Sequence, residues 1–159
     1  MMKTLKVLSM LVLAGTLSSA VVGCGGGRMT TRDAISLLDS PEPGDRRQAA
    51  DSLRGGKSVS FKKSVVPYEA IQPLINTLGH ESDPKVRGAI LITLGASGAP
   101  EAKAPIDEWV QKASSREEQR WYGRALKYYL IKTGVKDEGE KFPEGWPYGT
   151  NGYPPVIDD

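Results

Sequence analysis

A helix-pair pattern that recurs along the chain constrains its fold more than any other feature. In the clearest copy, the first helix is predicted by apolar residues at helical spacing, Ile71, Leu74, Ile75 and Leu78. Asp83 then caps a second helix that starts with Pro84, because the first turn does not need the N–H that proline lacks. We expect Gly95 and Gly98 to close this second helix. Its inner row is Val86, Ile90 and Leu94.

A first copy of the pattern precedes this unit, between residues 31 and 56. We expect Asp45 to begin its second helix, with Gln48 completing a start similar to a capping box. Its first helix carries the apolar residues Ala34, Ile35, Leu37 and Leu38, and its second carries Ala49 and Leu53.

A third copy follows Pro105. Ser115 and Glu118 have the spacing of a capping box for a helix that runs to about Lys132 and ends at Gly134. The preceding helix has an apolar face of Ile106, Trp109, Val110 and Ala113.

The repeat length supports a stack of such pairs. Superposing Arg46, Arg87 and Arg120 gives spacings of 41 and 33 residues, the first lengthened by an insertion at residues 57–67. A helix pair cannot bury its apolar stripe alone, so pairs stack, and about three are needed for stability. The sequence therefore predicts an all-α fold, a short α-solenoid of about three helix pairs over residues 31–134.

The second helices carry a family resemblance. The run from Val86 to Gly95, an arginine followed by small or apolar residues and Leu-Gly, resembles HEAT repeats, particularly the HEAT-like type named after phycobilisome lyases. Residues 45–53 are a looser copy, and the third copy departs from the pattern at Trp121 and Tyr122, which favours a capping repeat. The resemblance covers roughly residues 31–133. It implies a protein-binding scaffold in which Arg87 has a structural role.

The N-terminal segment predicts export and lipidation. Lys3 and Lys6 precede an apolar stretch, which is typical of a secretory signal, predicted here to be cleaved after residue 23. The sequence around Cys24 resembles the lipobox of bacterial lipoproteins, in which that cysteine is lipidated. Two or three acyl chains would anchor the protein stably to a bilayer. Residues 24–30 are then a lipidated, glycine-rich tether.

This interpretation predicts a place in the bacterial cell envelope, on the extracytoplasmic side. Gly25 after the cysteine resembles the pattern of lipoproteins sent to an outer membrane, where the cell has one. The chain from Cys24 onward has 19 basic and 19 acidic residues, so it lacks the positive charge of a nucleic-acid-binding protein. With Cys24 lipidated, no cysteine is left for a disulfide.

Residues that could carry chemistry are few. His80 is the only histidine and falls in a predicted turn, so we expect no catalytic residue, no cofactor and no metal site. The Gly55–Ser58 stretch resembles the end of a P-loop, but Asp51 stands where its first glycine should be, and a helix precedes it instead of a strand. We interpret it as a turn.

Aromatic residues are the remaining candidates for binding. Trp109 on one predicted helix and Tyr122 and Tyr129 on the next are predicted to be core. Trp121 and Tyr128 lie one position off the face of Tyr122 and Tyr129 and are candidate partner contacts. Residues 135–159 form a proline-, glycine- and aromatic-rich tail, whose Trp146 and Tyr148 are further candidates. The tail either caps the last repeat or offers a polyproline-type segment to a partner.

These observations predict a membrane-anchored scaffold that binds an unidentified envelope protein. The alternative is an accessory or chaperone-like factor that assists assembly or modification of another envelope component. A scaffold would hold its partner at stoichiometric level, and an assembly factor would hold it transiently.

Overall fold

The structure is a computed structural model, which describes residues 29–56 and 63–135. In these ranges the chain forms six α-helices and no strand. The first three are α1 (Thr31–Leu37), α2 (Pro43–Leu53) and α3 (Ile71–His80). The other three are α4 (Pro84–Ser97), α5 (Lys103–Lys112) and α6 (Arg116–Lys132). Short 3-10 turns lead into α3 and α5: η2 (Tyr68–Ala70) and η3 (Pro100–Ala102).

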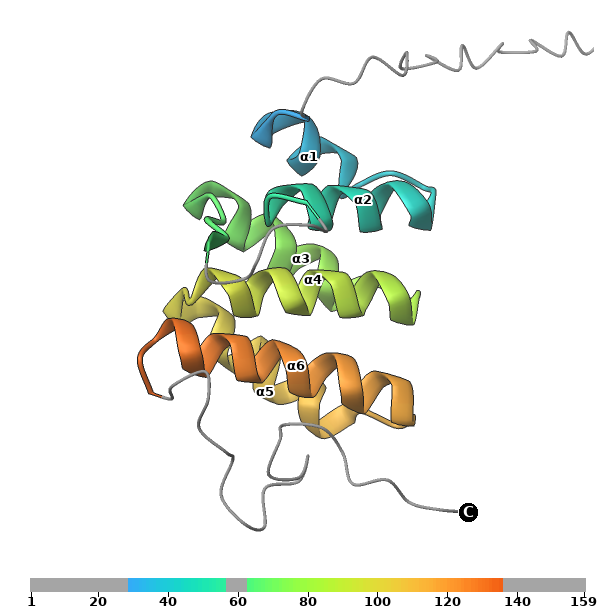
Figure 1. The fold of residues 1–159 in the computed structure, drawn as a ribbon. Coiled ribbons are helices and arrows are strands. Elements are labelled where there is room, and N and C mark those ends of the chain that lie inside the picture. Colours follow the sequence, from blue (N-terminus) through green and yellow to red (C-terminus); the bar gives the residue numbers. More distant parts are fainter. Residues whose placement is uncertain (1–28, 57–62, 136–159) are drawn as a thin grey trace, which may run out of the picture.

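The helices pair in chain order and the pairs stack. Figure 1 shows α2, α4 and α6 as three rungs one above another, with α3 and α5 behind them and α1 at the top of the stack. The pairs α1–α2, α3–α4 and α5–α6 therefore make a short solenoid. This confirms the fold predicted from the repeat. We call α2, α4 and α6 the second helices and α1, α3 and α5 the first helices.

The starts of the second helices follow their capping residues. Asp83 accepts hydrogen bonds from the backbone N–H groups of Lys85 and Val86 at 2.8 and 3.1 Å, and Pro84 is the first helical residue. Ser115 and Glu118 form the predicted capping box of α6. Both predicted starts are confirmed.

The predicted start of α2 was wrong. This helix begins at Pro43, two residues before Asp45, because the fixed φ of proline suits the first helical position. The N-cap residue Glu42 makes no side-chain capping bond. The Asp45 carboxylate instead accepts a hydrogen bond from the Ser40 hydroxyl at 2.9 Å. Asp45 lies in the first turn of α2 and therefore holds the loop that precedes this helix.

The centre of the molecule is α4, which neighbours cover on both sides. From Gly88 to Ala96 every residue of this helix is buried, polar Thr93 included. The Thr93 hydroxyl donates to a backbone carbonyl, which satisfies it inside the core. A helix that is apolar all round belongs in an interior, so α4 is the helix that the other two pairs enclose.

The predicted role of Gly95 was also wrong. The helix α4 runs through Ser97 and ends at Gly98, which has the left-handed φ of +65°. Gly95 lies inside the helix, at its contact with α6, where an added Cβ would stand 2.2 Å from the carbonyl oxygen of Ala125. Glycine is therefore needed here because the two backbones lie too close for any side chain.

Part of the insertion ties the first and last repeats together. Residues 57–62 lie outside the described part, but Ser64 is buried, and its hydroxyl donates to the carbonyl oxygen of Arg54 at the end of α2. The carbonyl of Ser64 accepts a hydrogen bond of 2.9 Å from the Lys132 ammonium, at the end of α6. The segment therefore joins the ends of two helices on either side of α4.

Candidate functional site

An arginine on the second helix fixes each junction between repeats. In the first repeat, the guanidinium of Arg46 donates to the carbonyl oxygens of Ser40 and Pro41, in the turn before its own helix. The same group donates to both carboxylate oxygens of Glu81, at 2.7 and 2.9 Å, in the second repeat. This two-pronged contact is the strong form of an arginine–carboxylate pair. It links residues 35 positions apart in the sequence.

The second repeat copies this arrangement. The Arg87 guanidinium donates to the carbonyl oxygens of Glu81 and Ser82, again in the turn before its own helix. It then reaches the third repeat, donating to the Glu118 carboxylate at 2.7 Å and to the Tyr122 hydroxyl oxygen at 3.1 Å. Arg87 therefore has the structural role that the sequence predicted.

These contacts keep both carboxylates ionised. Burial by itself would raise the pKa of Glu81, but the hydrogen bonds from Arg46 and from the Asp83 backbone outweigh it and leave the pKa below its ordinary value. Burial also opposes ionisation of Glu118, where bonds from Arg87 and Ser114 prevail and lower the pKa to about 2. The two junctions are thus ion pairs across the ordinary pH range.

The third repeat does not continue this series of arginines. Counted from the N-caps, Arg46 and Arg87 are each the fourth residue after the cap, and the residue at that position in α6 is Gln119. The superposition on Arg120 was therefore one residue out of register. Arg120 is exposed, beyond the position that would reach back to its own turn.

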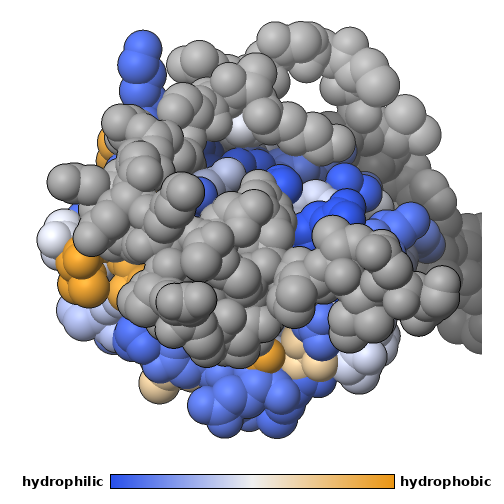
Figure 2. Space-filling view, turned by 60° about the horizontal axis from the view of Figure 1, so that its bottom comes forward, coloured by the Kyte–Doolittle hydropathy of each residue, from blue (hydrophilic) through white to orange (hydrophobic). Residues whose placement is uncertain are grey.

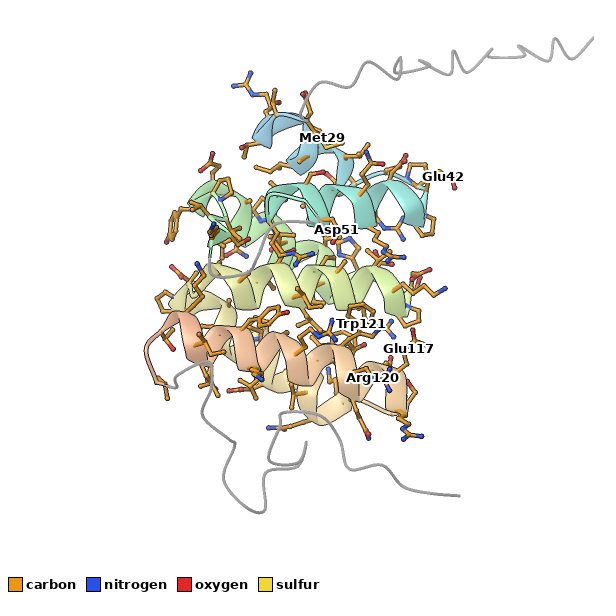
Figure 3. The ribbon with its side chains drawn as sticks, in the orientation of Figure 1. Met29, Glu42, Asp51, Glu117, Arg120 and Trp121 are labelled. Carbon is orange, nitrogen blue, oxygen red and sulfur yellow. The ribbon has the colours of Figure 1, made fainter. Side chains whose placement is uncertain are left out.

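The candidate site is the outward side of the second helices, which we call the second-helix face. It has a hollow at each end of the stack. The hollow on α2 is lined by Gly44, Arg47, Gln48, Asp51, Ser52 and Gly56. The hollow on α6 is lined by Arg116, Glu117, Arg120, Trp121 and Arg124. Figure 3 shows Asp51 at the edge of α2 that faces α4, and Trp121 between α4 and α6.

Trp121 forms one wall of the α6 hollow, an open depression of about 470 Å³. Its ring lies against the backbone of α4, since a Cβ added to Gly88 would be 3.2 Å from Cγ of the indole. The guanidinium carbon of Arg124 stands 5.4 Å from the centre of the same ring, within cation–π range. The ring is half-buried, so one edge of it remains open to the hollow.

A family comparison agrees with this geometry. The model of the family described as HEAT repeats matches residues 31–127, which is more than half of the chain. The protein belongs to the HEAT repeat family. No curated protein and no solved structure gives a match. The family match ends within α6, so it spans all three pairs of the HEAT solenoid.

The predicted contact residues are divided between described and undescribed parts of this HEAT protein. Trp121 lies in the α6 hollow, and Tyr128 is half-buried on the same helix. Cys24, Trp146 and Tyr148 lie outside the described residues. Tyr122 and Tyr129 are buried as predicted, whereas Trp109 is only partly so.

Sequence reasoning missed the basic residues of the α6 hollow. Arg116, Arg120 and Arg124 are spaced by four, which places them in one row along a helix. That spacing was legible in the sequence and could have identified them. The sequence does not show on which side of α6 this row lies, and therefore whether a neighbouring helix covers it.

Metal-binding groups do not gather in the described part of the HEAT solenoid. No three His, Cys, Asp or Glu residues within it could hold a metal ion together. His80 is exposed in the last turn of α3, where it lines a hollow together with Arg46 and Glu81. Those two residues already hold one another in an ion pair. The second-helix face therefore remains the best candidate site.

Proposed function

We propose that this HEAT repeat protein is a lipid-anchored lipoprotein that binds another protein of the bacterial cell envelope through its second-helix face. The observation that carries the proposal is the α6 hollow, where a half-buried tryptophan stands among arginines. Tryptophan and arginine are the residue types that most often dominate protein–protein binding energy. Solenoids commonly use the surface formed by their stacked helices to bind partners.

The anchor in this proposal is Cys24, with residues 1–23 removed. Support comes from the signal-like start of the sequence and from the lipobox resemblance. Within the described residues no helix is both long and apolar enough to cross a membrane. The predicted tether, residues 24–30, has seven residues and would keep the start of α1 at Thr31 roughly 15 Å from the lipidated cysteine.

Copurification from detergent-solubilised envelopes tests the binding face. Wild-type protein should enrich one protein at stoichiometric level, and Trp121→Ala should lose most of it. The matched control is Tyr68→Ala, which truncates an exposed aromatic residue on η2, outside the second-helix face. Equal enrichment by all three proteins would move the site elsewhere. A partner captured only by chemical crosslinking would favour the accessory, chaperone-like function instead.

Lipid labelling tests the anchor separately. Wild-type protein should incorporate labelled fatty acid, and Cys24→Ser should incorporate none and remain unprocessed. The comparison needs no partner, so it distinguishes failure of the anchor from failure of the binding face. An unlabelled wild type would contradict the envelope location.

A further inference from the structure

The two parts of the chain before and after the end of α6 have net charges of opposite sign. Residues 24–135 include 17 basic and 13 acidic residues, whereas residues 136–159 include two basic and six acidic ones. The neutral total therefore combines a domain with four excess positive charges and a C-terminal segment with four excess negative charges. Such an asymmetry in net charge between two parts of one chain suggests that each part binds a group of opposite charge.

Much of the positive charge is on α6, the last helix in the described part of the stack. This helix has five basic residues and two acidic ones, and one of the acids, Glu118, is already paired with Arg87 in the neighbouring repeat. Arg116 and Arg120 are exposed, and no described residue forms a hydrogen bond or ion pair with either guanidinium. The basic residues are Arg116, Arg120, Arg124, Lys127 and Lys132.

Comparison with α4 shows which side of α6 these residues occupy. Counted from the N-caps, Arg120 of α6 corresponds to Gly88 of α4, and Lys127 corresponds to Gly95. Both glycines of α4 lie at its contact with the next repeat, where they let α6 approach closely. The side of α6 that would face a fourth repeat therefore has long cationic side chains where α4 has none. We call Arg116, Arg120, Arg124 and Lys127 the cationic side of α6.

We propose that the acidic C-terminal segment of this same chain, residues 136–159, docks on the cationic side of α6. The segment starts immediately after Val135, three residues beyond the end of this helix. Its 24 residues could extend to about 80 Å, whereas α6 is about 25 Å long, so the segment can return along the whole helix. Being attached, it is present at an effective concentration of the order of millimolar.

The composition of the segment suits this surface further. Trp146 and Tyr148 lie between the acidic residues of its two ends, and such rings can stack on arginine guanidinium groups. Outside the grey residues, the surface visible in Figure 2 is largely hydrophilic, with smaller hydrophobic areas. The exposed guanidinium groups of Arg116 and Arg120 favour an ion-paired contact over an apolar cap.

The bilayer is a less suitable occupant of the same surface. The predicted tether precedes α1, and α6 lies at the opposite end of the stack (Figure 1). The docking itself does not depend on the proposed function.

Paramagnetic broadening in NMR spectra tests the docking without any partner. Cys24→Ser removes the only cysteine from the chain of residues 24–159, and Gly139→Cys then places a spin label in the acidic segment. Backbone amide signals at the start of α6, around Arg116 and Arg120, should lose intensity at low salt, and those of α1 should not. Raising the salt to about 1 M, where the Debye length is about 3 Å, should restore the α6 signals.

Charge reversal gives a second, independent readout. Arg116→Glu with Arg120→Glu should also restore the α6 signals at low salt. The matched control is Arg32→Glu with Lys63→Glu, which changes the net charge equally at exposed residues outside α6 and should leave the broadening intact. The salt titration uses unaltered α6, so the test does not depend on the folding of either variant.

Three results would overturn the proposal. The first is the absence of any loss of intensity at the start of α6. The second is a loss that neither salt nor charge reversal relieves, which would indicate an apolar cap. The third is a loss that appears when a labelled chain is mixed with an unlabelled, isotope-enriched chain, which would make the contact intermolecular. Because no envelope protein is present, none of these results bears on whether a partner exists.

Discussion

The helices α4 and α6 occupy equivalent positions in successive repeats. They differ in the residues on the side that faces, or would face, the following repeat. Toward the following repeat, α4 presents Gly88 and Gly95, and at the corresponding positions α6 presents Arg120 and Lys127. The starts of the two helices are alike, since each has a side chain that caps its first turn. The local signals that begin a helix are therefore repeated, whereas the residues between repeats are set by whether another repeat follows.

The largest effect on stability is expected from a substitution at Gly95, where α4 contacts α6. Gly95→Val would place a side chain where even a Cβ lies 2.2 Å from the Ala125 carbonyl oxygen, so α4 and α6 would have to separate. Because backbone cannot yield as a flexible side chain can, we expect the cooperative thermal transition to be lost.

Gly79→Ala is the matched control for this prediction. Gly79 lies in α3 with no atom within 4 Å of the added Cβ, so the substitution should stabilise the fold by about 0.5–1 kcal/mol. A Gly95→Val protein that melts like wild type would refute the close contact. Circular dichroism melts of the two variants make the measurement.

The next effect compares equivalent leucines of the two helices. Leu94 on α4 is fully buried, and Leu126 on α6 is 6% exposed at the corresponding position. We expect Leu94→Ala to cost about 3–5 kcal/mol and Leu126→Ala about 2–3 kcal/mol, because the terminal helix can collapse more easily around a cavity. Urea denaturation of both variants measures the difference. Equal losses would show that α6 is packed as an interior helix.

Acid should weaken the junction that joins α4 to α6. The pKa of Glu118 is about 2 in the fold and about 4.5 when unperturbed, so the folded state binds fewer protons. The stabilisation is therefore complete above about pH 4.5 and is lost as the pH falls toward 2, by up to about 2–3 kcal/mol.

Glu118→Gln tests this assignment. The variant should be less stable than wild type at pH 7, and its stability should fall less between pH 4.5 and pH 2. Glu108→Gln is the control, because Glu108 forms only an exposed pair with Lys112 on α5, and such pairs contribute little. A Glu118→Gln protein with the acid sensitivity of wild type would assign that sensitivity to other carboxylates.

The smallest effect concerns the N-terminal caps of α4 and α6, which should contribute equally to stability. Asp83→Ala and Ser115→Ala each remove a capping acceptor and should each cost about 1 kcal/mol. Glu42→Ala at the start of α2 should change stability by much less, because this side chain makes no capping bond. Chemical denaturation can rank the three. A Glu42→Ala loss equal to the others would mean that capping does not distinguish these helices.

The sequence predicted the elements well because their signals are local. Asp83-Pro84 and the Ser115–Glu118 pair each lie within a few residues of the helix that they start, and the buried rows of α3 and α4 follow from helical spacing. The start of α2 was misplaced because Asp45 is a good capping residue, and Pro43 two residues earlier prevails. Competing local signals of this kind cannot be ranked by type alone.

The candidate site was predicted only in part. Trp121 was identified because it lies off the buried face of its helix, but its contact with Gly88 is with a residue 33 positions away. The row from Arg116 to Arg124 was missed because a charged row on a helix normally just faces solvent. The row becomes informative only when α6 is known to be the last helix of the described stack.

The sequence by itself determined three helix pairs, the capped starts of α4 and α6, most of the buried rows and the HEAT repeat family, because periodicity, capping and proline geometry act over a few residues. The tertiary structure decided which residues meet across repeats: Arg46 with Glu81, Arg87 with Glu118, and Gly95 with the backbone of α6. Each of these depends on what lies on the far side of a helix. That is a property of the stacked chain, and no short segment of sequence encodes it.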